Sequence, residues 1–124
     1  MSPVIGVGID AVDIDRFRLL LARRPRMAER LFSGAERAFA GSRSDPVPSL
    51  AARFAAKEAV MKALSTGLGG VDFADIEVLA SPEGAPRLSV SGRASQRAGL
   101  LGVTRWHVSL SHTATLATAV VVAD

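Results

Sequence analysis

The chain has 124 residues, of which 48% are hydrophobic and none is cysteine, and its formal net charge is +3. This length suits one globular domain, 1–124, and the lack of cysteine excludes disulfides and thiolate metal sites. No apolar run approaches the roughly 20 residues that cross a bilayer, and MSPVIGVGID has no signal-peptide features, so we expect a cytoplasmic protein without membrane contacts.

The charge is unevenly distributed along the chain. Between Arg16 and Lys62, eleven Lys and Arg residues stand against four acidic ones, an excess of +7, whereas the rest of the chain has an excess of −4. A basic surface attracts nucleic acid, a phosphate-rich cofactor or an acidic protein. Because only 5% of residues are aromatic and none is tyrosine, base-stacking surfaces are scarce, which favours phosphate or an acidic protein.

The first expected strand, 4–12, has an unusual face. Alternate residues of a strand share a face, so Gly6, Gly8 and Asp10 lie together. Glycine weakens a strand, and two glycines beside a carboxylate predict a bare surface on which a ligand approaches the backbone. The alternative is that Asp10 only helps to cap the helix that follows.

Two short helices are expected next. The first begins near Asp13, extends to residue 23 or 24 and is ended by Pro25. Ser33 and Glu36 have the spacing of a capping box, which predicts a second helix that ends about one turn later.

An Ala-rich segment, 48–64, is the strongest helix candidate in the chain. Four-residue spacing places Glu58 and Lys62 on one side of this helix, and Phe54 and Met61 are close to Glu58 on the helical wheel. A carboxylate on so apolar a flank is either paired or used in chemistry. The alternative is an ordinary Glu58–Lys62 surface bridge, worth about a few tenths of a kcal/mol.

The long helix runs into a glycine-rich loop, 66–70. Backbone N–H groups of such loops can bind phosphate oxygens, although no GK[ST] sequence follows, so this is not a Walker A motif. Two short strands, 76–79 and 88–90, are expected beyond the loop, joined by a turn.

A helix over 91–101 and two strands, 106–110 and 116–123, complete the expected elements. Strands and helices are mixed without a regular βαβ repeat, so we expect an α+β fold with a mostly antiparallel sheet packed with the long helix. Near the end of strand 106–110, Ser111 and His112 offer a hydroxyl and an imidazole that suit phosphate. No G-x-S-x-G sequence indicates a hydrolase, and two histidines without cysteine argue against structural zinc.

Four segments together resemble the holo-acyl-carrier-protein synthase family of 4′-phosphopantetheinyl transferases. They are GVGIDAVDIDRF at 6–17, RFAAKEAVMKALSTGLG at 53–69, DIEV at 75–78 and HVSLSHT at 107–113. They follow the family's order and separations, and the one departure is Asp15, where the family usually has Glu. The resemblance implies a phosphopantetheinyl transferase fold and the transfer of 4′-phosphopantetheine from coenzyme A to a serine of apo acyl carrier protein. The products are holo carrier protein and 3′,5′-ADP, in support of fatty-acid or polyketide synthesis.

The resemblance also implies the roles of individual residues. Asp10 and Glu58 would ligate Mg²⁺, which prefers one or two carboxylates with phosphate oxygens and water. Glu58 and Lys62 would be catalytic, with Glu58 a candidate base for the serine proton. The residues expected to bind coenzyme A are Lys62, Thr66, Gly67, Leu68, Gly69, Ser111 and His112. Arg16 and Arg24 resemble part of the basic patch that meets the acidic helix of the carrier protein.

The longer members of the superfamily consist of two tandem halves, and this chain is about one half. The resemblance therefore implies a homotrimer with active sites between subunits. Strand 116–123, which is apolar on both faces, is one candidate for the contact.

Two non-enzymatic alternatives remain open at this point. A nucleic-acid-binding module would explain the basic half but not the carboxylate on the glycine strand, because carboxylates repel phosphate unless a metal intervenes. A structural oligomerisation domain would explain only the apolar C-terminal strands.

Overall fold

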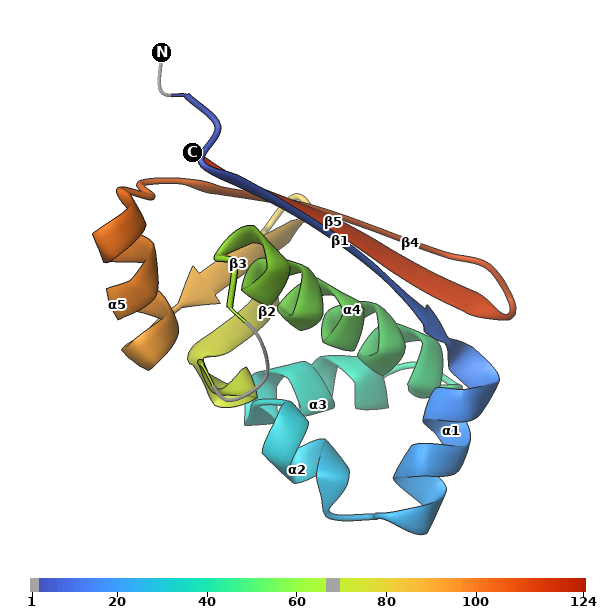
Figure 1. Cartoon of the computed structure of the whole chain (residues 1–124). Coiled ribbons are helices and arrows are strands. Elements are labelled where there is room, and N and C mark those ends of the chain that lie inside the picture. Colours follow the sequence, from blue (N-terminus) through green and yellow to red (C-terminus); the bar gives the residue numbers. More distant parts are fainter. Residues whose placement is uncertain (1–2, 67–69) are drawn as a thin grey trace.

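One long central helix organises the fold of this chain (Figure 1). The structure is a computed structural model that describes residues 3–66 and 70–124. The first elements are β1 (Gly6–Asp13), α1 (Ile14–Arg23), α2 (Met27–Leu31), α3 (Gly34–Gly41) and α4 (Val47–Ala63). The later elements are the 3-10 helix η1 (Phe73–Asp75), β2 (Ile76–Ala80), β3 (Pro86–Val90), α5 (Gly92–Leu101), β4 (Trp106–His112) and β5 (Leu116–Ala123).

The strands form two antiparallel sheets, as the expected α+β class requires. The larger sheet has the order β1-β5-β4, and β2 pairs with β3 in a separate hairpin. Figure 1 shows α4 lying along one face of the larger sheet, with α1, α2 and α3 on the opposite side of α4. The short elements α2 and η1, five and three residues long, were not anticipated from the sequence. Neither has a long hydrophobic period, and α2 has no side-chain cap at its N-terminus.

Helix α4 is buried on almost every side, which explains its weak amphipathic pattern. Its Ala-rich surface packs closely, and a proline in its first turn is compatible with a helix start. Beyond that first turn, the side chains of α4 that escape burial are Phe54, Glu58 and Lys62. Their four-residue spacing makes them a single stripe along the helix. This stripe is the part of α4 available to a ligand.

The glycine face of β1 is explained by α4 and not by a ligand. A Cβ atom at Gly6 would overlap the carbonyl oxygen of Ala63, and a Cβ at Gly8 would overlap that of Ala59. The two glycines therefore let the helix backbone lie directly against the strand. Our expectation that a ligand occupies this surface is wrong, and the closeness instead brings Asp10 up to α4.

The opposite face of the larger sheet is uncovered, and it is apolar on the side of β1. On β5, Ala117, Ala119 and Val121 point toward α4 and are buried, whereas the alternate residues point away. Val7 and Ile9 on β1 point the same way as those alternate residues and are 57% and 66% exposed.

No helix within the described residues is both long and apolar enough to cross a membrane.

Candidate functional site

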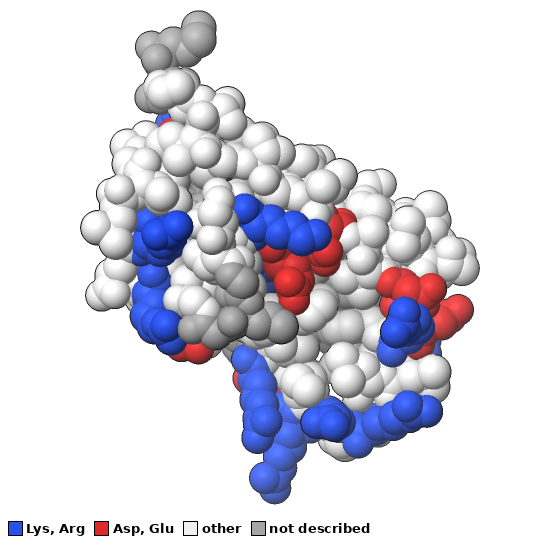
Figure 2. Space-filling view, viewed as in Figure 1, with Lys and Arg blue, Asp and Glu red and all other residues white. Residues whose placement is uncertain are grey.

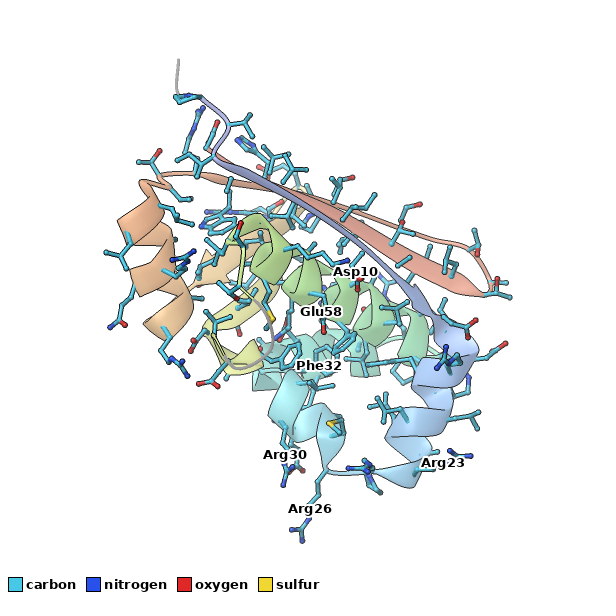
Figure 3. All side chains as sticks on the ribbon, viewed as in Figure 1. Asp10, Arg23, Arg26, Arg30, Phe32 and Glu58 are labelled. Atoms are coloured by element: carbon cyan, nitrogen blue, oxygen red, sulfur yellow. The ribbon has the colours of Figure 1, made fainter. Side chains whose placement is uncertain are left out.

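Asp10 and Glu58 lie together at the mouth of one cleft. Asp10 comes from β1 and Glu58 from α4, and both line a cleft of about 460 Å³. In Figure 3 the two labelled side chains reach toward the same space from the strand and the helix. The structure therefore joins two carboxylates that are 48 positions apart in the sequence.

Lys62 lies beside this carboxylate pair. Its Nζ donates to the backbone oxygen of Ile9 at 2.8 Å and to Asp10 Oδ1 at 3.1 Å. The lysine thus ties α4 to β1 at the cleft, which is a more specific arrangement than a Glu58–Lys62 bridge along one helix. The Lys62 side chain remains 53% exposed, so its ammonium group is accessible to an anion.

The alternative role of Asp10 as a helix cap is taken by another residue. Asp13 precedes α1, and its Oδ1 accepts the backbone N–H of Arg16 at 2.9 Å. This leaves Asp10 to face Lys62 and Glu58.

The electrostatics of the cleft favour a cation. Burial raises the pKa of Glu58, and repulsion from Asp10 raises it further, while Lys62 partly offsets both effects. Asp10, Glu58 and Lys62 together leave a net charge of −1. Among the described residues no group of three His, Asp or Glu side chains surrounds a common point. A carboxylate pair of this kind fits Mg²⁺, which takes few protein ligands and fills its shell with phosphate and water.

Phenylalanine side chains form the floor of the same cleft, and sequence reasoning missed this role. Phe17 and Phe54 line it together with Arg16 from the first turn of α1. Their ring centroids are 5.2 Å apart. The stripe position of Phe54, four residues before Glu58, was the only sequence signal for this contact.

His112 lies in a second cleft, of about 350 Å³, on the other flank of α4. Arg43, Arg53 and Ser49 line the cleft with it. Arg53 is only 6% exposed and donates to Ser49 Oγ at 2.8 Å, while its Nε has no hydrogen-bond partner. Arg43 and Arg53 bring two positive charges to this cleft, which suits an anion. Sequence analysis did not single out Arg43 or Arg53, because charge alone does not distinguish them from the other arginines.

Ser111 and Arg24 lie apart from both carboxylates. Ser111 precedes His112 on β4 and therefore points to the uncovered face of the sheet. Arg24 is the C-cap residue of α1 and borders a shallow hollow with Arg26 and Arg30.

The face of the molecule shown in Figure 2 has acidic atoms near its middle and Lys and Arg side chains along its lower edge. Figure 3 labels Arg23, Arg26 and Arg30 at that edge.

The glycine-rich loop is described only at its edges. Thr66 follows α4, and its backbone N–H donates to the oxygen of Met61 at 3.0 Å. Gly67, Leu68 and Gly69 lie outside the described residues, so their expected contact with coenzyme A stays a prediction.

Comparison with known proteins identifies the family. Residues 6–121 match the family described as the 4′-phosphopantetheinyl transferase superfamily. The chain belongs to this superfamily. A holo-[acyl-carrier-protein] synthase of Streptomyces griseus is 51% identical over 121 residues, which cover 98% of each chain. The predicted family and enzyme class are thereby confirmed.

Solved structures of the superfamily share the fold. The crystal structure of holo-[acyl-carrier-protein] synthase from Neisseria meningitidis superposes with a TM-score of 0.89 at 31% identity, covering 98% of this chain and 99% of that one. The Helicobacter pylori enzyme in complex with coenzyme A gives a TM-score of 0.81 at 32% identity, covering 95% and 99%. The predicted fold class is confirmed by these matches.

Proposed function

We propose that Asp10 and Glu58 hold a Mg²⁺ ion for the reaction of this protein, which transfers 4′-phosphopantetheine from coenzyme A to a serine of apo acyl carrier protein. Relatives named holo-[acyl-carrier-protein] synthase match the chain over nearly its whole length. The structure of one such enzyme, from Helicobacter pylori, contains coenzyme A. The observation that carries the metal proposal is the convergence of two carboxylates from β1 and α4 beside Lys62.

The side chains of the cleft suit phosphoryl transfer. The serine oxygen of the carrier forms a bond to the β-phosphorus of coenzyme A, the bond to the leaving phosphate breaks, and 3′,5′-ADP departs. Bound Mg²⁺ would neutralise charge on the pyrophosphate. Lys62 is exposed beside Asp10 and can contact the same phosphates. Glu58, whose pKa burial raises, is the candidate acceptor of the serine proton.

The second cleft supports a separate role in binding coenzyme A. His112, Arg43 and Arg53 line it, and we assign them to the 3′-phosphate at the adenosine end. Within one chain this cleft and the Asp10–Glu58 cleft lie on opposite flanks of α4, because residues 49 and 53 face one way and residues 54 and 58 the other. One cofactor molecule would therefore contact His112 of one subunit and Glu58 of another.

This division supports a homotrimer with active sites between subunits. The exposed sheet face carrying Val7, Ile9 and Val120 is the surface we assign to the contact, since apolar patches of this kind are usually covered. A closed ring repeats one heterologous contact around its axis.

We assign carrier-protein binding to the basic side of α1. Arg16 lies in the cleft beside Glu58, and Arg24 lies at the far end of the same helix. Helical rise over the eight residues between them gives about 12 Å, enough to follow one face of an acidic helix.

Calorimetric titration tests the metal site directly. Coenzyme A is titrated into the protein with and without Mg²⁺, in the presence of an RNA competitor, and into Asp10→Ala as the matched variant. We expect binding to the native protein to depend on Mg²⁺ and to resist RNA, and the variant to lose the Mg²⁺ dependence. Equal binding with and without Mg²⁺ would contradict the proposal.

Subunit mixing tests the shared site. Glu58→Ala and His112→Ala chains, each first shown to be impaired, are refolded together. Some interfaces then carry neither lesion, and activity should partly return. An active monomer in sedimentation, or no rescue in mixtures proven to exchange subunits, would defeat the shared-site proposal.

A further inference from the structure

Lys57 and Glu36 form an ion pair in the centre of the protein. Each residue is 1% exposed, and Lys57 Nζ lies 2.8 Å from Glu36 Oε1. Burial lowers the pKa of Lys57, and Glu36 partly offsets this effect. Burying two charges carries a desolvation cost that an apolar pair of similar volume avoids, so such a pair is weak evidence of a stabilising role. The hydrogen bonds of the Lys57–Glu36 pair therefore suggest a role other than stability.

Glu36 joins three separate elements. Its Oε1 accepts the backbone N–H of Ser33 at 2.9 Å, which completes the capping box of α3. Its Oε2 accepts the backbone N–H of Val78 on β2 at 2.9 Å. The carboxylate is therefore fixed in place by the backbone, and Lys57 is the side chain that it holds.

Lys57 in turn contacts two phenylalanines. Its Nζ donates to the backbone oxygen of Phe73 at 3.2 Å and lies 5.4 Å from the centroid of the Phe32 ring. These residues end a row of rings. Phe32 packs edge-on against Phe17 at 6.2 Å, Phe17 lies 5.2 Å from Phe54, and Phe54 stacks on Phe73 at 5.4 Å.

The middle of this aromatic row, Phe17 and Phe54, is the floor of the Asp10–Glu58 cleft. Lys57 thus contacts both ends of the row. Figure 3 shows Phe32 below Glu58, on the side of α4 away from the sheet. Phe17 belongs to α1, the helix that also carries Arg16. The row therefore sets the α1 side of the cleft, where the carrier protein is proposed to approach.

We propose that Lys57, held by Glu36, is a positioning residue for the carrier-protein half of the reaction, because it fixes both ends of the aromatic row that floors the active cleft. This inference rests on the proposed function. Coenzyme A is proposed to contact Asp10 and Glu58 through Mg²⁺, Lys62 directly, and the second cleft with its adenosine end. None of these contacts is made by the rings of the row, so coenzyme A binding should be insensitive to the pair.

The test is a neutral double variant, Lys57→Met with Glu36→Gln, in which the glutamine oxygen remains an acceptor for one of the two backbone N–H groups. We expect kcat/KM for the carrier protein to fall by about tenfold or more, since small displacements near reacting groups are costly. Mg²⁺-dependent affinity for coenzyme A should stay within about twofold, and the melting temperature within about 5 °C. Val121→Ala, on the buried face of β5, is the control for lost stability, and its kcat/KM should be unchanged.

Each outcome of this test supports or overturns the positioning role of Lys57. A folded double variant with native kcat/KM for the carrier, or with equal losses for carrier and coenzyme A, overturns the positioning role. If the double variant does not fold, Phe32→Leu decides, because it leaves the ion pair intact while removing the ring contacts. We then expect a smaller carrier-specific loss of about threefold, and no loss overturns the inference. Failure of the native protein to bind coenzyme A with Mg²⁺ would instead count against the proposed function.

Discussion

Lys57 and Glu58 are adjacent on α4, yet they belong to charge clusters of opposite character. Lys57 is buried with Glu36, whose two oxygens accept three hydrogen bonds from Lys57, Ser33 and Val78. Glu58 faces a cleft in which Asp10 and Lys62 are its charged neighbours, and that cluster keeps a net charge of −1.

The two clusters differ in how fully their charges are compensated by neighbouring groups. The buried cluster has one positive and one negative charge, both hydrogen-bonded, so its charges are compensated within the protein. The open cluster holds two carboxylates, and burial together with repulsion from Asp10 raises the pKa of Glu58. A cation would compensate the excess negative charge of the open cluster, as proposed above for Mg²⁺. The comparison can be tested by altering each cluster separately.

The largest effect should come from the open cluster. Asp10→Ala and Glu58→Gln should each lower the transfer rate by about two to three orders of magnitude or more, the scale of losing one electrostatic contact to a reacting group. The fold should stay intact, because each change removes a charged group that lines a cleft and leaves the packing of the core unchanged. Rates measured across Mg²⁺ concentration, with circular dichroism as the folding control, check this. Near-normal rates at low Mg²⁺ would refute the ligand assignment.

Breaking the ion pair of the buried cluster should have its largest effect on stability. Lys57→Met leaves Glu36 without its counter-charge, and breaking a buried pair typically costs about 3–5 kcal/mol of the free energy of unfolding. The matched variant Lys62→Met, in the open cluster, should cost less than about 1 kcal/mol because that lysine is half-exposed, while still reducing transfer. Urea unfolding of both variants gives the comparison. Equal losses of stability would remove the distinction between the clusters.

A third prediction concerns the rim of the open cleft. Arg16→Glu should raise the KM for carrier protein by about tenfold with little change in the KM for coenzyme A. The difference between native and variant should shrink as salt rises, because the Debye length is only about 8 Å at physiological ionic strength. Equal changes in both constants would mean that Arg16 serves the cofactor or the fold.

The smallest effect is on stability and follows from the raised pKa of Glu58. An acid whose pKa is higher in the folded state disfavours folding once it ionises, so the native protein should lose this stability as pH rises through the folded pKa. Without metal, Glu58→Gln should therefore melt higher than the native protein at about pH 7 and equally at about pH 4. Thermal melts with a chelator across this range measure it, and a variant that melts lower at neutral pH would show that Glu58 is stabilised and not strained by its surroundings.

Local sequence rules determined much of the framework. The Ser33–Glu36 spacing predicted the capping box of α3, the start of α1 was placed near its cap residue Asp13, and the alanine-rich segment predicted α4 to within one residue at each end. These features depend on residues within one helical turn, so they are legible without knowledge of the neighbours. Strand alternation likewise placed Asp10 on the face of Gly6 and Gly8, which is the face toward α4.

What those faces meet was decided only by the tertiary structure. Gly6 and Gly8 lie against the backbone of α4, Glu36 pairs with a lysine 21 positions away, and His112 shares a cleft with Arg43 and Arg53 and not with Asp10. Each of these contacts joins segments distant in sequence, and periodicity gives the direction of a side chain but not the identity of what packs against it. The sequence alone therefore determined the main helices and the direction of alternate side chains, and long-range packing decided which residues share a cleft.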